Sequence, residues 1–133
     1  MFVRDLMTPD PLTLHVGDSI DLAEKFMGFA HIRHLPVMDD EGRVVGLITH
    51  RDLLATLSAG KARGATTVRQ IMRLQVATVG PETEVKDAID RMLGAKYGCL
   101  PVVEHQRLVG IITEADFLKL TRTLLSIDPA RNI

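Results

Sequence analysis

The chain has 133 residues, of which 46% are hydrophobic, 25% charged and 4% aromatic. This composition is typical of an ordinary globular protein and excludes the disordered and fibrous classes. The 16 basic and 17 acidic residues leave a formal net charge of −1 without a basic block, which argues against nucleic-acid binding. Because Cys99 is the only cysteine and no apolar run reaches the roughly 18 residues of a membrane helix, we expect a cytoplasmic protein without a membrane partner.

The first half of the chain predicts a mixture of helices and strands, taken here in chain order. A short helix over residues 3–7 ends at Thr8-Pro9-Asp10-Pro11, and an extended piece follows around residues 12–14. A second helix starts at Asp18-Ser19, because apolar residues recur at helical spacing up to Ala30. Two strands (35–38 and 44–48) then enclose a hairpin turn at 39–42, and a further helix runs from about His50 to Ser58.

The second half predicts the same elements in the same order. An extended piece at 77–79 precedes a helix over about 84–95, strands over 100–103 and 108–112, and a last helix over about 114–125. The hairpin turn at 104–107 lacks the glycine of the first copy. Residues 60–66 have the glycine and charge content of an exposed linker, and residues 128–133 are expected to fray.

The two halves are copies of one unit. Met7 and Met72 lie 65 positions apart, and so do Pro36 and Pro101. We therefore divide the chain into repeat 1 (1–59), a linker (60–66), repeat 2 (67–127) and a tail (128–133). Each βαββα unit alone leaves an apolar sheet face uncovered, so the repeat predicts an α+β fold in which the two units pack sheet to sheet with pseudo-twofold symmetry.

Few polar residues are shared by the two copies, and these carry the functional argument. They are Thr13 and Thr78, Thr49 and Thr113, and Asp52 and Asp116. The last two pairs form a Thr-x-x-Asp motif where a strand passes into a helix, so the motif can serve only as a capping box. The alternative is a binding role, in which the carboxylate accepts hydrogen bonds from two ribose hydroxyls while the Thr hydroxyl and free backbone N–H groups face a phosphate.

Three motifs together resemble a tandem pair of cystathionine-β-synthase (CBS) domains over essentially the whole chain. They are Leu-Met-Thr-Pro near the start, Leu-Pro-Val before each hairpin, and Gly-h-h-Thr-x-x-Asp (h, apolar) before the last helix of each copy. In that family the Asp typically holds a ribose, the Thr or Ser holds a phosphate, and adenine lies in the cleft between the repeats. The resemblance implies two such clefts. One would contain Thr113 and Asp116 with Thr13, Arg33, His34, Leu35 and Pro36; the other would contain Thr49, Arg51 and Asp52 with Thr78, Gly98, Cys99, Leu100 and Pro101.

The two implied clefts differ in charge. Arg33 and His34 could neutralise a phosphate in the Asp116 cleft, whereas Gly98 and Cys99 occupy the matching positions of the other cleft. We therefore expect the Asp116 cleft to bind more tightly, although Arg51 could supply a cation beside Asp52. Repeat 2 also departs from Met-Thr-Pro with Met72-Arg73-Leu74, so Arg73 is either a further phosphate contact or a solvated side chain.

Other reactive side chains favour structural roles. His31 and His34 have a spacing that could place both imidazoles on one helical face, but closed zinc sites need about four N or S ligands, so we expect no metal. Cys99 lacks a neighbouring base and is expected to be a buried strand residue.

The function expected from these observations is a stand-alone sensor that binds AMP, ADP, ATP or a related adenosine compound as a regulatory ligand and has no catalytic cofactor. The resemblance also implies a homodimer, and any output would pass through an unknown protein target. Two alternatives remain open. One is a small enzyme, which the absence of a repeated base and nucleophile disfavours; the other is a ligand-free interaction module in which the Thr-x-x-Asp motifs only cap helices.

Overall fold

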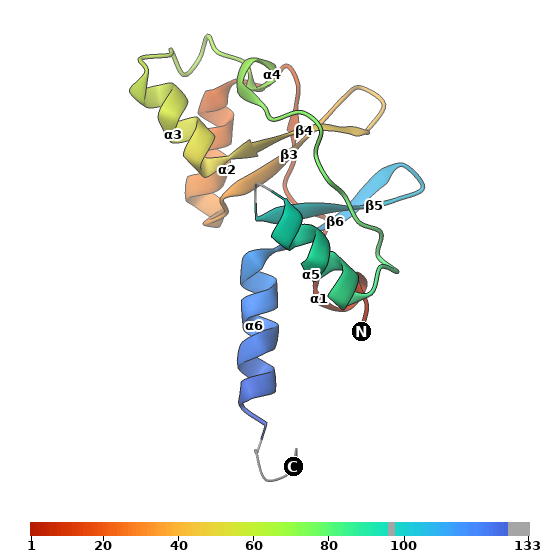
Figure 1. Ribbon diagram of the computed structural model, residues 1–133. Coiled ribbons are helices and arrows are strands. Elements are labelled where there is room, and N and C mark those ends of the chain that lie inside the picture. Colours follow the sequence, from red (N-terminus) through yellow and green to blue (C-terminus); the bar gives the residue numbers. More distant parts are fainter. Residues whose placement is uncertain (96–97, 128–133) are drawn as a thin grey trace.

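Two three-stranded sheets form the centre of the computed structural model, which describes residues 1–95 and 98–127 (Figure 1). One sheet has the strand order β2-β3-β4 and the other β1-β6-β5. Helices cover these sheets, so the predicted α+β fold is confirmed. The strands are β1 (Thr8–Pro9), β2 (Leu14–His15), β3 (His34–Met38), β4 (Val44–Thr49), β5 (Cys99–Glu104) and β6 (Arg107–Thr113).

The helices also follow the sequence pattern closely. The predicted helix after each hairpin is present at its expected bounds, as α3 (His50–Ser58) and α6 (Glu114–Leu125). Ser19 caps the start of α2 by accepting a hydrogen bond from the Leu22 N–H at 3.4 Å, as the Asp-Ser signal predicts. The remaining helices are α1 (Val3–Leu6), α2 (Ile20–Ala30), α4 (Val68–Ile71) and α5 (Val85–Gly94).

The extended pieces differ in detail from the sequence expectation. The first lies at Leu14–His15 rather than at 12–14, and the second is a single parallel bridge between Val79 and Val102. Residues 60–65 of the expected linker are exposed, but Thr66 at its end is buried. The tail, residues 128–133, lies outside the described residues.

The two repeats exchange their N-terminal segments. The short helix α1 packs on the core of repeat 2, where Val3 is fully buried, and α4 packs on the core of repeat 1 through Val68 (Figure 1). Backbone bonds hold each segment in place: the Val3 N–H donates to the Thr83 carbonyl at 2.9 Å, and the Val68 N–H donates to the Asp18 carbonyl at 2.8 Å. The sequence repeat and the packing unit are therefore not the same, because α1 and the strand β1 that follows it pack with repeat 2.

Strand β1 completes this exchange. It pairs antiparallel with β6, with Thr8 opposite Ile111 and Pro9 opposite Gly110. The equivalent position in repeat 2, Arg73, forms an antiparallel bridge with Leu47 of β4. Each sheet therefore receives its outer chain segment from the opposite repeat.

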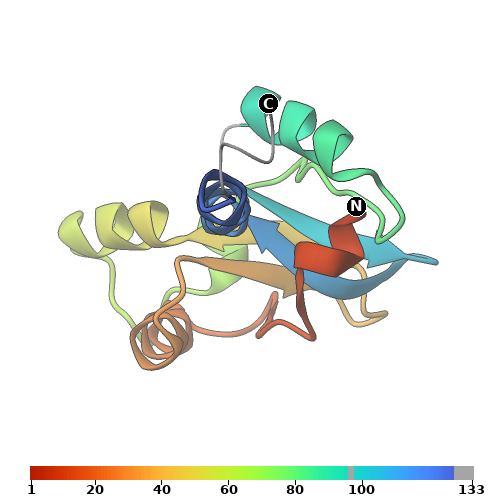
Figure 2. The same ribbon diagram turned by 90° about the horizontal axis from the view of Figure 1, so that it is seen from below.

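A third apolar cluster joins the sheets. Leu47 of β4, Cys99 of β5 and Ile111 of β6 pack against one another, and Val76 lies against them. All three buried residues are at most 8% exposed. This cluster confirms that the repeats meet through their sheets, and it fixes the relative position of the two Thr-x-x-Asp motifs. Figure 2 shows the same arrangement along α6, which extends away from the sheets and contains no buried residue.

Candidate functional site

Both Thr-x-x-Asp motifs lie at the junction between the last strand of a sheet and the helix that follows it. Thr49 is the N-cap of α3, and Thr113 is the N-cap of α6. Asp52 and Asp116 therefore occupy the third helical position, where unsatisfied N–H groups and the positive end of the helix dipole favour an anion. The sequence prediction of these junctions is confirmed, but the two carboxylates have different partners.

In repeat 1 the threonine caps the helix and the carboxylate turns to an arginine. The Asp52 N–H donates to Thr49 Oγ1 at 3.1 Å. Arg73 donates to both carboxylate oxygens, from Nε to Oδ2 at 2.7 Å and from its terminal nitrogen to Oδ1 at 2.8 Å. This bidentate pairing, at a side chain only 17% exposed, lowers the pKa of the Asp52 carboxyl below its ordinary value. From the sequence, Arg73 was expected to be a phosphate contact or a solvated residue, and its pairing with Asp52 was not predicted.

In repeat 2 the carboxylate folds back onto its own helix start. The Thr113 N–H donates to Asp116 Oδ2 at 2.8 Å, and the Thr113 hydroxyl lies 3.4 Å from the same oxygen. This is the capping box that the sequence allows. Within residues 1–95 and 98–127, both of these contacts are made to Oδ2 of the carboxylate.

The arginine is placed by the exchanged segment. The Leu47 N–H donates to the Arg73 carbonyl at 3.0 Å, and the Arg73 N–H donates to the Leu47 carbonyl at 2.8 Å. The preceding residue, Met72, passes directly over Gly46, where an added Cβ would lie 2.5 Å from its Sδ. The glycine of the Gly-h-h-Thr-x-x-Asp motif is thus needed for the close approach of the segment that carries Arg73.

The residues expected across the clefts lie near the helix starts of their own repeats. The Arg33 carbonyl accepts a hydrogen bond from the His50 N–H at 2.8 Å, and the Gly98 carbonyl accepts one from the Glu114 N–H at 3.1 Å. His34 pairs with Thr49, and Cys99 pairs with Thr113. Arg33 is therefore anchored beside α3, the helix that carries Asp52. Of the remaining predicted residues, Pro36 and Pro101 are buried, Thr13 and Thr78 are half-buried, and Arg51 is exposed.

Two reactive side chains have structural positions. Cys99 is 2% exposed, and burial raises the pKa of its thiol to about 12, which leaves it protonated and unreactive near neutral pH. The expected buried strand residue is confirmed. His31 and His34 share no helical face, because α2 ends at Ala30 and His31 adopts a left-handed backbone with φ of 54°. Within the described residues no group of three or more His, Cys, Asp and Glu could hold a metal ion.

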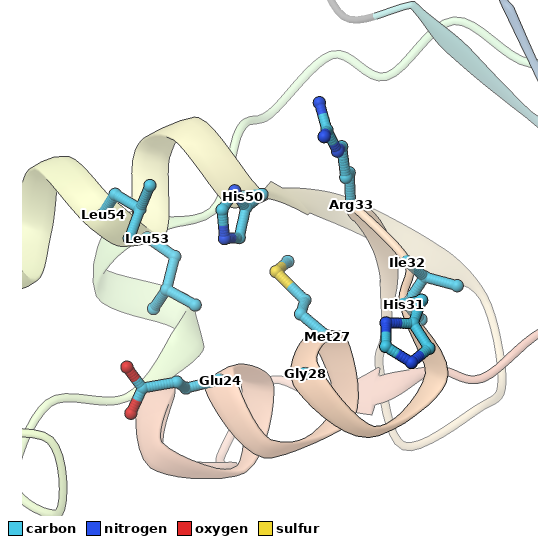
Figure 3. A pocket seen from close by; sticks show the side chains of 9 residues that line it. All are labelled: Glu24, Met27, Gly28, His31, Ile32, Arg33, His50, Leu53 and Leu54. Atoms are coloured by element: carbon cyan, nitrogen blue, oxygen red, sulfur yellow. The ribbon is translucent and has the colours of Figure 1, made fainter. Parts of the chain in front are cut away.

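A cavity of about 310 Å³ lies between α2 and α3, and His50 of the first Thr-x-x-Asp motif is among the residues that line it. In Figure 3 Met27 and His50 point into this space, whereas Arg33 points away from it. This cavity was not predicted from the sequence, although Gly28, near the C-terminal end of α2, provides a signal, since a missing side chain leaves room beside the next helix. The lining is completed by Glu24, His31, Ile32, Leu53 and Leu54.

Comparison with known proteins adds independent findings. The family model for the CBS domain matches residues 3–59 and 68–122. The L-aspartate semialdehyde sulfurtransferase of Methanocaldococcus jannaschii is 33% identical over 119 residues, which make up 89% of this chain. The chain spans only 23% of that relative's length and a similarly small share of the other curated relatives it matches first.

Two solved structures share the fold over most of both chains. The CBS domain pair of protein MJ0100, in complex with 5′-methylthioadenosine and S-adenosyl-L-methionine, is 31% identical, with a TM-score of 0.84 and coverage of 92% of this chain and 97% of that one. CBSX2 of Arabidopsis thaliana, in complex with AMP, is 27% identical, with a TM-score of 0.79 and coverage of 92% and 97%. No helix in the described part of the chain is long and apolar enough to cross a bilayer.

Proposed function

The chain belongs to the CBS domain family, and from this premise we propose that it is a regulatory module that binds an adenosine-containing nucleotide in clefts between its two repeats. The observation that carries the proposal is the paired position of the two motifs. Each places a threonine at the N-cap and an aspartate at the third position of the helix that follows the last strand of its sheet. The ligands of MJ0100 and CBSX2 share an adenosine moiety, which supports this ligand class.

The proposed contacts follow from the chemistry of the helix starts. Asp52 and Asp116 would each accept hydrogen bonds from the two ribose hydroxyls, and Thr49 and Thr113 would face a phosphate. In the structure each carboxylate has an internal partner, so the ribose must compete with it. For Asp116 that partner is Thr113, whose backbone N–H and hydroxyl both contact Oδ2.

A binding titration with paired variants tests the proposal. Asp52→Asn and Asp116→Asn keep the size of the side chain, and Asp116→Asn also keeps a capping oxygen, but both lose the charge that makes a good acceptor for two hydroxyls. We expect calorimetry with AMP to show about a tenfold or larger loss of affinity at the altered cleft, by analogy with lost charge-assisted hydrogen bonds. Asp87→Asn, an exposed carboxylate on α5, is the matched control and should bind AMP normally.

The 2.8 Å capping bond of Asp116 favours a second candidate, a ligand-free interaction module. Under this alternative no adenosine compound would bind. A thermal-shift panel of AMP, ADP, ATP and S-adenosylmethionine distinguishes the two, since a ligand at 100 times its dissociation constant stabilises the folded state by about 2.7 kcal/mol. The absence of any shift would refute the sensor function.

We further propose that the module is not catalytic, acts in the cytoplasm and works as a homodimer through its helices. The large exposed side chains Phe29 (91%), Leu93 (79%), Leu118 (69%) and Leu54 (49%) lie on α2, α5, α6 and α3, respectively, and would be covered by a second copy. Sedimentation should then give a dimer at micromolar concentration and a monomer for Phe29→Asp. A wild-type monomer would contradict the proposed homodimer. Turnover of ATP, detected by chromatography, would contradict the proposal that the module is not catalytic.

A further inference from the structure

The start of α3 is surrounded by basic residues and the first turn of α6 carries acidic ones, although the two repeats align in sequence. Arg33, Arg51 and Arg73 accompany α3, and their counterparts in the other repeat are Gly98, Ala115 and Thr8. The first helical residue adds to the contrast, because His50 of α3 corresponds to Glu114 of α6. The backbone contacts described above attach each set to its own helix start.

Arg73 determines what a ligand must offer at Asp52. Both carboxylate oxygens accept hydrogen bonds from the guanidinium, at 2.7 and 2.8 Å. Each oxygen keeps a further lone pair, so a ribose diol must either share these oxygens with Arg73 or displace it. Arg51 adds a second positive charge that acts on the same carboxylate. Displacing a guanidinium from its carboxylate is costly unless it finds another anion, and a phosphate is a good bidentate partner for it.

The Asp116 cleft makes no such demand. Its carboxylate is held by the backbone N–H and the hydroxyl of Thr113, and breaking these bonds separates no ion pair. Thr8, which takes the place of Arg73 in β1, is exposed and uncharged. An uncharged nucleoside can therefore use Asp116 without supplying a counter-ion.

On the premise of the proposed function, we infer that Arg73 makes the Asp52 cleft selective for phosphorylated nucleosides, whereas the Asp116 cleft also accepts uncharged ones. The pair Arg73 and Asp52 acts as a filter: the phosphate takes the guanidinium, and the ribose takes the carboxylate. The sequence suggests that the Asp116 cleft binds more tightly than the Asp52 cleft. Under this inference, that order of affinity applies to uncharged nucleosides and depends on the ligand.

The test compares AMP with adenosine, which has the same base and ribose but no phosphate, in the full chain. An Asp116→Asn background leaves only the Asp52 cleft. There, AMP should bind at least about tenfold more tightly than adenosine, as expected for a charge-assisted contact. Replacing Arg73→Thr should bring the two affinities together, because AMP loses a partner while adenosine gains a free carboxylate. Arg69→Thr, an exposed arginine on α4, is the matched control and should keep the preference for AMP.

The reciprocal variant keeps the inference testable if Arg73→Thr folds poorly. Thr8→Arg, in an Asp52→Asn background, should give the Asp116 cleft the same preference for AMP and weaken adenosine binding. Equal affinities for AMP and adenosine at the Asp52 cleft of the wild-type chain would overturn the inference and leave the proposed function intact. An equal loss of both ligands in Arg73→Thr would also overturn it, since it would assign Arg73 a purely structural role. If neither compound binds the wild-type chain, the proposed function fails as well.

Discussion

Adding one methyl group at Gly110 tests whether the exchanged strand β1 holds the second sheet together. In Gly110→Ala the new Cβ would lie 2.5 Å from Sδ of Met7 and 2.9 Å from the carbonyl oxygen of Thr8. The methionine can rotate away, but the carbonyl belongs to β1, which must then move off β6. Overpacking of this kind costs about 1–3 kcal/mol, and the stiffer unfolded chain returns about 0.4–1 kcal/mol. We expect a net loss of about 1–2 kcal/mol.

The assay is urea denaturation with and without the substitution, supported by a thermal scan in which the midpoint should fall by about 3–8 °C. Gly28→Ala is the matched control, because an added Cβ there meets nothing within 4 Å inside helix α2. It should stabilise the chain by about 0.5–1 kcal/mol through helix propensity. If Gly110→Ala leaves the denaturation midpoint unchanged or raises it like the control, β1 does not pack on Gly110 as described.

Three further predictions concern single features of the structure. Because pairing with Arg73 lowers the pKa of Asp52, the pair stabilises the fold above the ordinary aspartate value of 3.8, and this contribution disappears as the pH falls through the lowered pKa. Urea titrations of wild type and Asp52→Asn should differ by at most about 1 kcal/mol at pH 7, since Arg73 is half exposed, and converge near pH 2. Cys99, with a pKa of about 12, should resist iodoacetamide in the native chain and react fully in urea; fast labelling of native protein would show an open inter-sheet core. His105 and Gln106 have φ of 51° and 67° in a two-residue hairpin, so replacing them with Asn and Gly should raise stability by about 1 kcal/mol in thermal scans, and a loss would contradict the turn geometry.

Most elements could be predicted because their signals are local and occur twice. The apolar spacing of α2, the hairpins and the two Thr-x-x-Asp junctions each depend on a few neighbouring residues, and the second copy confirms the first. Strand β1 was missed because Thr8-Pro9 is only two residues long and its partner lies about a hundred residues away in β6. No periodicity marks such a strand, and a proline in it argues against one.

The candidate site was predicted in its residue types but not in its internal pairing. Thr49, Asp52, Thr113 and Asp116 stand where the motif places them. The ion pair of Asp52 with Arg73 depends on a segment exchange that joins residues 21 positions apart, so no local pattern reveals it. The signal was the departure of repeat 2 from Met-Thr-Pro, which identified Arg73 as unusual without indicating its partner.

The exchange of N-terminal segments also shapes how the chain must acquire its structure. Residues 1–9 are synthesised about a hundred residues before β6, the strand with which β1 pairs. Formation of this sheet is therefore limited by long-range contacts, and neither repeat alone contains all the segments of its own packing unit. Cleavage of the chain between the repeats should therefore give two aggregation-prone fragments that do not fold independently.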